Sequence, residues 1–295
     1  MSNLNPIDFP IGIGDDMAQM CFGGLDTALI TTDMLLDGTH FDLSIHTLEQ
    51  VGYKSMAESL SDCAAMATIP FAAVVAVALP KGFGSDQLKE IHKGLLKSGD
   101  MFGCKLIGGD ITTWGDQRAK LAVNVTVLSK PAATPPIRRS TAKAGDIVCV
   151  TGTLGGSIQG KHISFIPRVK EALEIARIAS PTAMMDISDG LSTDLTHLTR
   201  LSNVGAIIDE ALIPISEAAA NTRFPLMAAL NDGEDFELLF TLSEENFHKL
   251  CDNWRMDTPV TSIGRITGKK VLIRYNDGSL KDLLPRGYDH LRNEL

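Results

Sequence analysis

Residues 28–41 have the sequence ALITTDMLLDGTHF, in which a short apolar run is followed by Thr-Thr-Asp. The run predicts a strand over residues 28–32 that ends at Asp33. Acidic residues with small neighbours recur at four other places: GIGDD (Asp15, Asp16), SD (Ser61, Asp62), IGGD (Asp110) and MDISDG (Asp186, Ser188, Asp189). Most of these places follow a predicted strand, and strand ends are where α/β folds bind ligands. The pattern therefore predicts an acidic ligand site built from several segments.

A set of ordinary turns is the competing interpretation. A single aspartate beside a glycine is more often a turn residue than a metal ligand, and Thr-Thr-Asp can also cap a helix. Asn or Ser would serve such turns equally well, yet all five places have Asp. Asp62 differs because it lies inside a predicted helix, on a face with small residues from which it can point into a cleft. Together the five places favour a site that binds metal and phosphate.

The chemistry that suits such a cluster is phosphoryl transfer from ATP. Bare carboxylates would repel the polyphosphate, so hard cations must stand between the two. Mg²⁺ prefers oxygen ligands and bridges carboxylates to phosphate oxygens. Transfer then depends on in-line positioning and on charge neutralisation, to which Arg139 or Lys143 can contribute. The sequence thus predicts a magnesium-dependent phosphotransferase.

Predicted strands and helices alternate along the chain, which indicates a mixed α/β class with two domains. Helices are predicted at residues 47–67, from residue 85, at 168–179 and at 189–202, and Pro70 is expected to close the first of them. Strands are predicted at residues 71–79, 104–110, 120–129, 146–152, 234–242 and 270–275. Residues 130–146, KPAATPPIRRSTAKAGD, form the best linker candidate. We therefore expect domains at residues 1–135 and 136–295.

Composition excludes several classes of protein. The net charge of −9 disfavours a nucleic-acid surface and adhesion to an anionic membrane. The five cysteines are scattered, without the spacing of a zinc site or a disulfide framework. The N-terminus lacks the features of a signal peptide, and the longest apolar run, residues 71–79, is too short to span a bilayer. A soluble, cytoplasmic protein is expected.

One motif imitates a P-loop. GGSIQGKH, residues 155–162, has the glycine and lysine spacing but places His162 where the motif needs Ser or Thr to hold Mg²⁺. We therefore expect a tight glycine turn rather than a phosphate loop. The histidines form no HxxxH or HExxH pair, and only His40 lies beside the acidic segments. His40 is either a histidine satisfied by the backbone or a contact to an anionic substrate.

Longer strings carry a family resemblance. The strings are, in order, GIGDD, TTDMLLDGTHF, SDCAAMATIP, IGGDITT, RRSTAKAGD, VTGTLGG, MDISDGLSTD, NDGEDFELLF and GYDHL, from residue 12 to residue 291. In order and spacing they resemble the thiamine-monophosphate kinase family of the aminoimidazole-ribotide-synthetase-like superfamily. The resemblance implies a two-domain fold, ATP and several Mg²⁺ ions between the domains, and a homodimer whose N-terminal sheets pair. It also implies direct transfer of the γ-phosphoryl group of ATP to thiamine monophosphate.

The resemblance also implies roles for individual residues. Its metal-binding positions match Asp16, Thr31, Thr32, Asp33, Asp62, Asp110, Asp186 and Asp189. Positions that touch ATP match Gly109, Asp110, Arg139 and Ser188, and positions that line the thiamine phosphate pocket match His40, Glu234 and Tyr288. No residue is expected to act as an acid or base, because the acceptor phosphate is already mostly ionised near neutral pH. Asp33, Asp62 and Asp189 are expected to assist the transfer through bound metal.

Two other functions compete with this one. A superfamily relative would phosphorylate another small phosphate or carboxylate acceptor. A nucleotide-binding regulator would have lost turnover, although such a protein would be expected to lose some of the carboxylates that this sequence retains. An assay of ADP release with different acceptors separates the three.

Overall fold

The first half of the chain builds a five-stranded sheet. The computed structural model describes residues 5, 7–22, 27–116 and 118–288. The strand order is β1 (Ala18–Cys21), β2 (Thr27–Leu36), β5 (Ala122–Pro131), β3 (Thr68–Leu79) and β4 (Lys105–Thr113). Neighbouring strands are antiparallel except β3 and β4, which are parallel. β4 is therefore an edge strand reached through a helical crossover.

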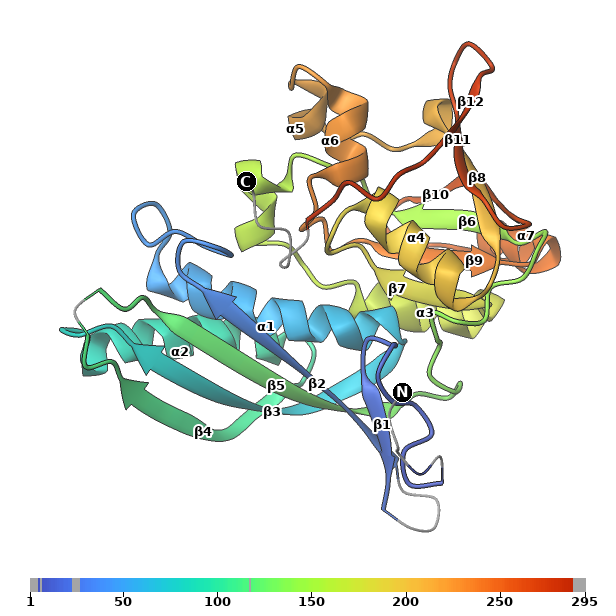
Figure 1. The fold of residues 1–295 in the computed structure, drawn as a ribbon. Coiled ribbons are helices and arrows are strands. Elements are labelled where there is room, and N and C mark those ends of the chain that lie inside the picture. The colour runs from blue at the N-terminus through green and yellow to red at the C-terminus, as the bar shows by residue number, and fades with distance from the viewer. Residues whose placement is uncertain (1–4, 6, 23–26, 117, 289–295) are drawn as a thin grey trace.

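Two helices cover one face of this sheet (Figure 1), namely α1 (Leu48–Ala65) and α2 (Ser85–Asp100). Thr47 and Gln50 form a capping box that starts α1. The two helices meet backbone to backbone, because a Cβ on Gly52 would lie 2.0 Å from the carbonyl oxygen of Ile91. Gly94 makes the same approach from the other helix, with 1.9 Å to Glu49 O. Glycines thus allow α1 and α2 to pack closely against each other.

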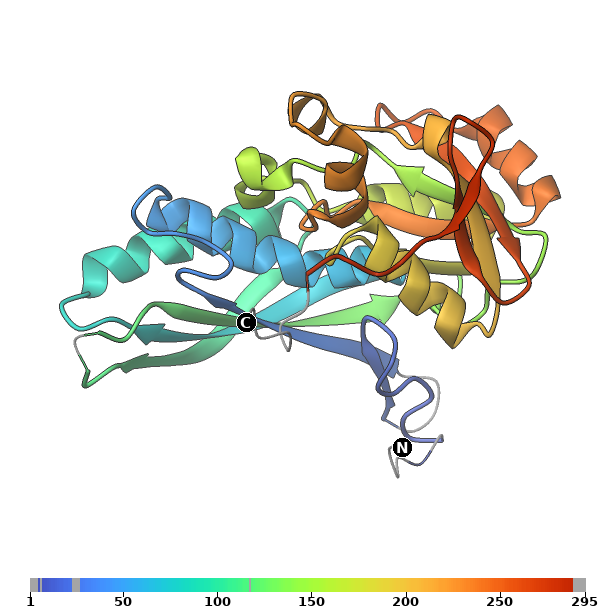
Figure 2. The same ribbon diagram turned by 45° about the horizontal axis from the view of Figure 1, so that its top comes forward.

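Within the described ranges, no helix covers the opposite face of the five-stranded sheet (Figure 2). Strand residues alternate between the two faces. Leu35 and Val75 are buried under α1 and α2, whereas Met34, Leu36 and Val74 are exposed on the other side. We call this side, which carries residues 32, 34 and 36 of β2, the open face. It presents apolar side chains to solvent in the single chain.

The second half builds a seven-stranded sheet with helices on both faces. Its order is β12 (Leu280–Asp282), β11 (Val271–Arg274), β8 (Gly205–Asp209), β10 (Val260–Thr267), β6 (Ile147–Thr151), β9 (Leu238–Leu242) and β7 (Ala183–Asp186). α3 (Val169–Ala179) and α7 (Glu244–Asn253) pack on one face. α4 (Leu191–Leu201) and α6 (Pro225–Asn231) pack on the other, with the short α5 (Glu217–Ala220) beside α6. Both sheets are mixed, as expected for the mixed α/β class.

The two halves share a core. One hydrophobic cluster contains Leu60 of α1, Val125 of the first sheet and Phe240 of the second. α1 contacts both β7 and α3, so it is buried on more than one side. The first sheet ends at Pro131 and the second begins at Ile147; the domain boundary near residue 135 stays a prediction. None of the helices in the described ranges is long and apolar enough to cross a membrane.

Several sequence-based boundaries are wrong, including that of the strand predicted over residues 234–242, which begins only at Leu238. β2 continues through Asp33 to Leu36, and β4 continues through Asp110 to Thr113, so both aspartates lie inside strands. Both strands extend because their backbones pair with a neighbour along their length, whatever the polarity of the side chain. Pro70 does not close α1 but lies within β3, beside a shift in register with β5. It precedes Ala72, where β4 begins to pair with β3, so it lies at a place where a strand tolerates proline.

Candidate active site

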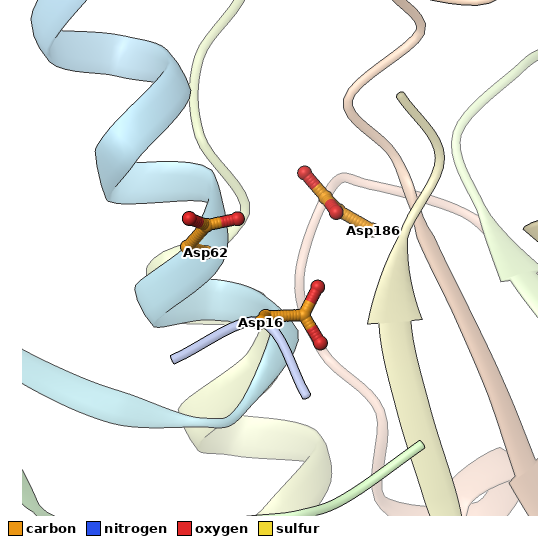
Figure 3. Close-up of side chains that lie close together, drawn as sticks. All are labelled: Asp16, Asp62 and Asp186. Atoms are coloured by element: carbon orange, nitrogen blue, oxygen red, sulfur yellow. The ribbon is translucent and has the colours of Figure 1, made fainter. Parts of the chain in front are cut away.

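Three aspartates converge from distant parts of the chain. Asp16 lies in the loop before β1, Asp62 in the last turn of α1 and Asp186 at the end of β7. One carboxylate oxygen from each lies within 4.8 Å of the others (Figure 3). The predicted convergence of scattered acidic residues therefore occurs, between the two halves of the molecule.

Hydroxyl groups hold these carboxylates in place. Thr31 donates a hydrogen bond to the Asp62 carboxylate, and Ser61 Oγ donates to Asp186 Oδ2 at 2.5 Å. Asp33 faces α1 from β2 and accepts a bond of 2.5 Å from Ser59 Oγ. Two serines that precede Asp62 in sequence, Ser59 and Ser61, thus orient the neighbouring carboxylates. We call Asp16, Asp33, Asp62 and Asp186 the acidic cluster.

The acidic cluster has too little positive charge of its own. Burial raises the pKa of Asp62 well above its usual range, and the charges of Asp33 and Asp186 raise it further. Burial and the nearby Asp16 likewise raise the pKa of Asp186, to about 7. Arg139 makes a two-pronged contact with Asp16, with 2.7 Å from Nε to Oδ2. An all-oxygen, electron-rich set of this kind fits Mg²⁺.

The acidic cluster opens into a cleft of about 570 Å³. Of the residues placed on substrate and ATP positions from the sequence, the cleft is lined by His40, Arg139, Ser188, Glu234 and Tyr288, together with Asp189. Among its described lining residues, eight are Asp or Glu and only Arg139 carries a permanent positive charge. Most of the predicted site residues therefore share one acidic cleft.

Glu234 lies on a tightly constrained loop. Glu234 and Phe236 have left-handed backbones, with φ of 53° and 48°. The N–H of Glu234 donates to Ser188 O at 2.7 Å, and that of Phe236 donates to Ile187 O at 2.8 Å. A Cβ on Gly233 would lie 2.7 Å from Ser188 O, so only glycine fits there. The loop before β9 is therefore locked onto the loop that carries Ser188 and Asp189.

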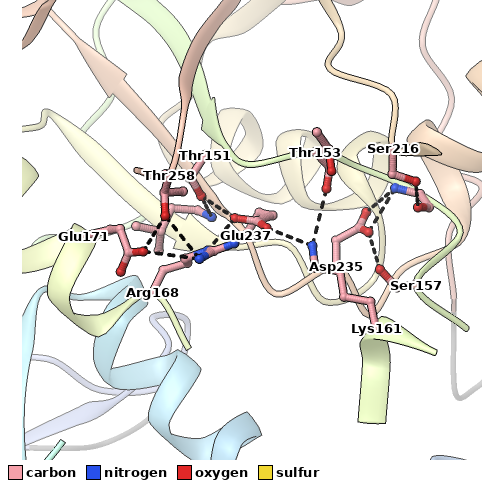
Figure 4. A network of polar contacts seen from close by, with 12 residues as sticks. Thr151, Thr153, Ser157, Lys161, Arg168, Glu171, Ser216, Asp235, Glu237 and Thr258 are labelled. Atoms are coloured by element: carbon pink, nitrogen blue, oxygen red, sulfur yellow. Dashed lines mark hydrogen bonds and ion pairs between the residues drawn. The ribbon is translucent and has the colours of Figure 1, made fainter. Parts of the chain in front are cut away.

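A polar network supports this loop from behind (Figure 4). Arg168 makes two bonds of 2.7 Å to the buried Glu237 carboxylate, and Lys161 Nζ lies 2.8 Å from the same group. The N–H of Gly155 donates to Asp235, and that of Gly156 donates to Asp232. In the motif that imitates a P-loop, the backbone amides of Gly155 and Gly156 and the side chain of Lys161 therefore bind carboxylates of this chain. The glycine turn is structural.

The C-terminal segment returns to the cleft. The N–H of Tyr288 donates to Asp189 O at 3.0 Å, and that of Gly287 donates to Thr193 Oγ1 at 3.0 Å. A Cβ on Gly287 would lie 1.8 Å from Asp189 O. Residues 287–288 therefore lie directly against the turn that carries Asp189. The remainder of the GYDHL string is outside the described residues.

Two predicted site residues lie elsewhere in the single chain. Gly109 and Asp110 are on β4 and line a separate cavity of about 520 Å³ with Leu88 and His92 of α2. Asp110 is in register with Ala76, Asn124 and Met34, a row that crosses the open face. Thr32 also faces this side, since its hydroxyl contacts Thr126 Oγ1 at 2.9 Å, although it borders the cleft as well.

Sequence reasoning missed two charged residues of α1. Lys54 and Glu58 precede Asp62 at intervals of four, so the three share one helical face. Lys54 is fully buried, and its Nζ lies 2.6 Å from Glu234 Oε2 and 3.1 Å from Glu58 Oε1. The signal was available, because charged residues at this spacing inside a largely apolar helix are unusual.

Family models match both halves of the chain. Residues 14–130 match the AIR synthase related protein N-terminal domain, and residues 159–275 match the corresponding C-terminal domain. A thiamine-monophosphate kinase of Rhodopirellula baltica is 33% identical over 95% of this chain and 91% of its own length. One of Methanospirillum hungatei is 38% identical over 89% of this chain and 88% of its own.

The chain belongs to the thiamine-monophosphate kinase family. Solved members of the thiamine-monophosphate kinase family also share its fold. A structure described as AaThiL complexed with AMPPCP and TMP has a TM-score of 0.81 and 29% identity over 95% of this chain and 92% of its own. The thiamine-monophosphate kinase of Stenotrophomonas maltophilia has a TM-score of 0.74 and 30% identity over 92% of each chain. The family and fold implied by the sequence motifs are thus confirmed.

Proposed function

We propose that the chain transfers the γ-phosphoryl group of ATP to the phosphate of thiamine monophosphate, giving thiamine diphosphate. The observation that carries this proposal is the acidic cluster at a cleft that also contains His40, Glu234 and Tyr288. Support comes from the relatives named thiamine-monophosphate kinase and from the structure complexed with AMPPCP and TMP. AMPPCP has the charge and shape of ATP with a methylene between its last two phosphorus atoms.

The acidic cluster is proposed to hold Mg²⁺, with Asp16, Asp33, Asp62 and Asp186 as ligands from one chain and Thr31, Thr32 and Asp189 nearby. Bound Mg²⁺ would offset the negative charge of the polyphosphate and polarise its oxygens. Ser59, Ser61 and Thr31 keep the carboxylates oriented by hydrogen bonds. Arg139 and Ser188 are proposed to contact ATP from the same cleft.

No acid or base is assigned in this proposal. The acceptor oxygen belongs to a phosphate monoester, whose second pKa is about 6, so it is largely ionised at neutral pH. The chain then has to orient the acceptor rather than remove a proton from it. His40, Glu234 and Tyr288 line the cleft and are proposed to do so.

A homodimer is part of the proposal, because Gly109 and Asp110 are otherwise remote from the cleft. The open face exposes Met34, Leu36 and Val74, with exposed fractions of 59%, 40% and 36%. A second copy placed on this face would bury those side chains and bring another Asp110 toward Thr32. We propose that each site is completed by Gly109 and Asp110 of the partner copy.

The test is ADP release from ATP and Mg²⁺ with thiamine monophosphate as acceptor. We expect ADP and thiamine diphosphate in equal amounts, no turnover with unphosphorylated thiamine, and no turnover with excess EDTA. ADP formed only with another phosphate or carboxylate acceptor would contradict the proposed acceptor and identify a superfamily relative. Nucleotide binding without ADP from any acceptor would instead indicate a regulator.

A further inference from the structure

The buried ammonium of Lys54 faces two carboxylates at once. Its Nζ lies 2.6 Å from Glu234 Oε2 and 3.1 Å from Glu58 Oε1, and Lys54 itself is 0% exposed. Both glutamates line the cleft, with side-chain exposures of 11% for Glu58 and 24% for Glu234. Among the residues that the structure describes, no second Lys or Arg forms an ion pair with either glutamate.

This arrangement leaves one negative charge uncompensated when both glutamates are ionised. A buried charge without a partner is unfavourable, so Glu58 keeps its proton at neutral pH unless a second cation lies beside it. Burial raises the pKa of Glu58 to about 8, and the opposing effect of Lys54 does not cancel it. A positive charge placed in the cleft beside Glu58 would complete the balance.

The surroundings favour an organic cation over a hydrated metal ion. Phe41, Ile45, Ile158 and Phe236 line the same cleft, and a metal ion has the acidic cluster available instead. Apolar and aromatic surfaces suit a flat ring, and aromatic faces attract ring cations. A permanently charged heteroaromatic ring matches both the apolar lining and the excess negative charge.

We infer that Glu58 is a specificity-determining residue, whose carboxylate favours an acceptor with a permanent positive ring charge over a neutral ring of the same shape. Lys54 is a positioning residue, because its ammonium contacts the carboxylates of both Glu58 and Glu234. This inference rests on the proposed function and deepens it, since the thiazolium ring of thiamine monophosphate carries such a charge.

The test compares two probes, a phosphoethyl thiazole and the same compound methylated on its ring nitrogen. Their dissociation constants are measured by calorimetry with Mg²⁺ and AMPPCP present. We expect the wild-type protein to bind the charged probe about tenfold more tightly than the neutral one. In Glu58→Gln, which keeps the shape of the side chain, the ratio should fall to about twofold, with nucleotide affinity unchanged.

Asp42→Asn is the matched control. Asp42 is exposed, lines the same cleft and accepts a bond of 2.8 Å from the N–H of Ser44 through an oxygen that Asn retains. Asp42→Asn removes one negative charge, as Glu58→Gln does. If the ratio of the two probe dissociation constants is unchanged in Asp42→Asn and falls in Glu58→Gln, the effect is local to Glu58. An equal fall of the ratio in both variants would overturn the inference, because the preference would then come from the overall negative charge of the cleft.

The remaining outcomes are equally distinct. Equal binding of both probes by the wild-type protein, with thiamine monophosphate still phosphorylated, would overturn this inference and leave the proposed function standing. Failure of both probes to bind, with no ADP from thiamine monophosphate, would overturn the two together. Glu58→Met serves as a second variant if Glu58→Gln does not fold, with the same expected fall in the ratio.

Discussion

Asp62 and Asp110 come from similar motifs but lie in opposite surroundings. Asp62 is on α1, between the two halves, and has Asp16 and Asp186 within reach of one metal ion. Asp110 is exposed on edge strand β4, in a row with Ala76, Asn124 and Met34. A single chain therefore brings Asp62 together with other carboxylates and leaves Asp110 facing solvent. The difference indicates that a motif identifies the chemical type of a residue without identifying where that residue lies in the fold.

Loss of the central carboxylate should have the largest effect. Asp62→Asn keeps the size of the side chain but removes one anionic ligand, so kcat for thiamine monophosphate should fall by about a thousandfold. Without metal, the Asp62→Asn variant should unfold at a higher temperature than the wild type, because burial and neighbouring carboxylates already disfavour the charge of Asp62. Steady-state kinetics and thermal unfolding measure the two effects.

The control for this variant is Asp86→Asn, whose carboxylate is exposed at the start of α2 and pairs with Lys89. Its activity should match the wild type. Full activity of Asp62→Asn at saturating Mg²⁺ would remove Asp62 from the metal site.

Mixing two inactive variants tests whether Asp110 acts in the partner copy. In a mixed dimer of Asp62→Asn and Asp110→Asn, one site collects both defects and the other collects none. Equal amounts of the two, after subunit exchange, should therefore recover about a quarter of the wild-type activity. Each variant incubated alone provides the control. Lack of recovery despite demonstrated mixed dimers would show that Asp110 does not serve a neighbouring site.

The crowded acidic cluster should also make stability depend on pH. The pKa of Asp186 is about 7 in the folded protein against an ordinary value of 3.8, so the folded state binds this proton more tightly than the unfolded state does. In EDTA, the free energy of unfolding should therefore fall as the pH rises from about 4 to 7, by up to about 1.4 kcal/mol per pH unit for this group.

The Asp186→Asn variant isolates that contribution. Urea unfolding gives the free energy of unfolding of each protein, and the value for the wild type minus that for the variant is followed against pH. This difference should become less favourable to the wild type as the pH rises and should level off above pH 7. A difference that stays constant across this range would contradict the raised pKa.

The smallest effect is expected at the glycine turn. Lys161 pairs with Glu237 and the turn amides bind Asp232 and Asp235, so Lys161→Met should change kcat by less than about threefold. A lysine that contacted ATP phosphates would be far more sensitive. Lys143→Met, on a surface loop, provides a comparison. A large loss confined to Lys161→Met would revive the P-loop interpretation.

The sequence predicted which residues share the cleft better than it predicted the elements that carry them. Helical Asp62 was expected to point into a cleft, and the structure confirms that it does. Asp33 was expected at a strand end but lies within β2, because pairing with β5 continues to Leu36. Lys54 and Glu58 were missed because their importance depends on Glu234, which is 180 residues from Lys54 in sequence. The spacing of Lys54 and Glu58 within α1 marks them as unusual, but it does not identify Glu234 as their partner.

The contact of Gly287 and Tyr288 with the Asp189 turn has a consequence for biosynthesis. Every other segment of the cleft leaves the ribosome before these two residues do. A nascent chain can therefore assemble its acidic cluster while the wall formed by Tyr288 is still missing. Translation order thus makes the Tyr288 side of the cleft the last part to form.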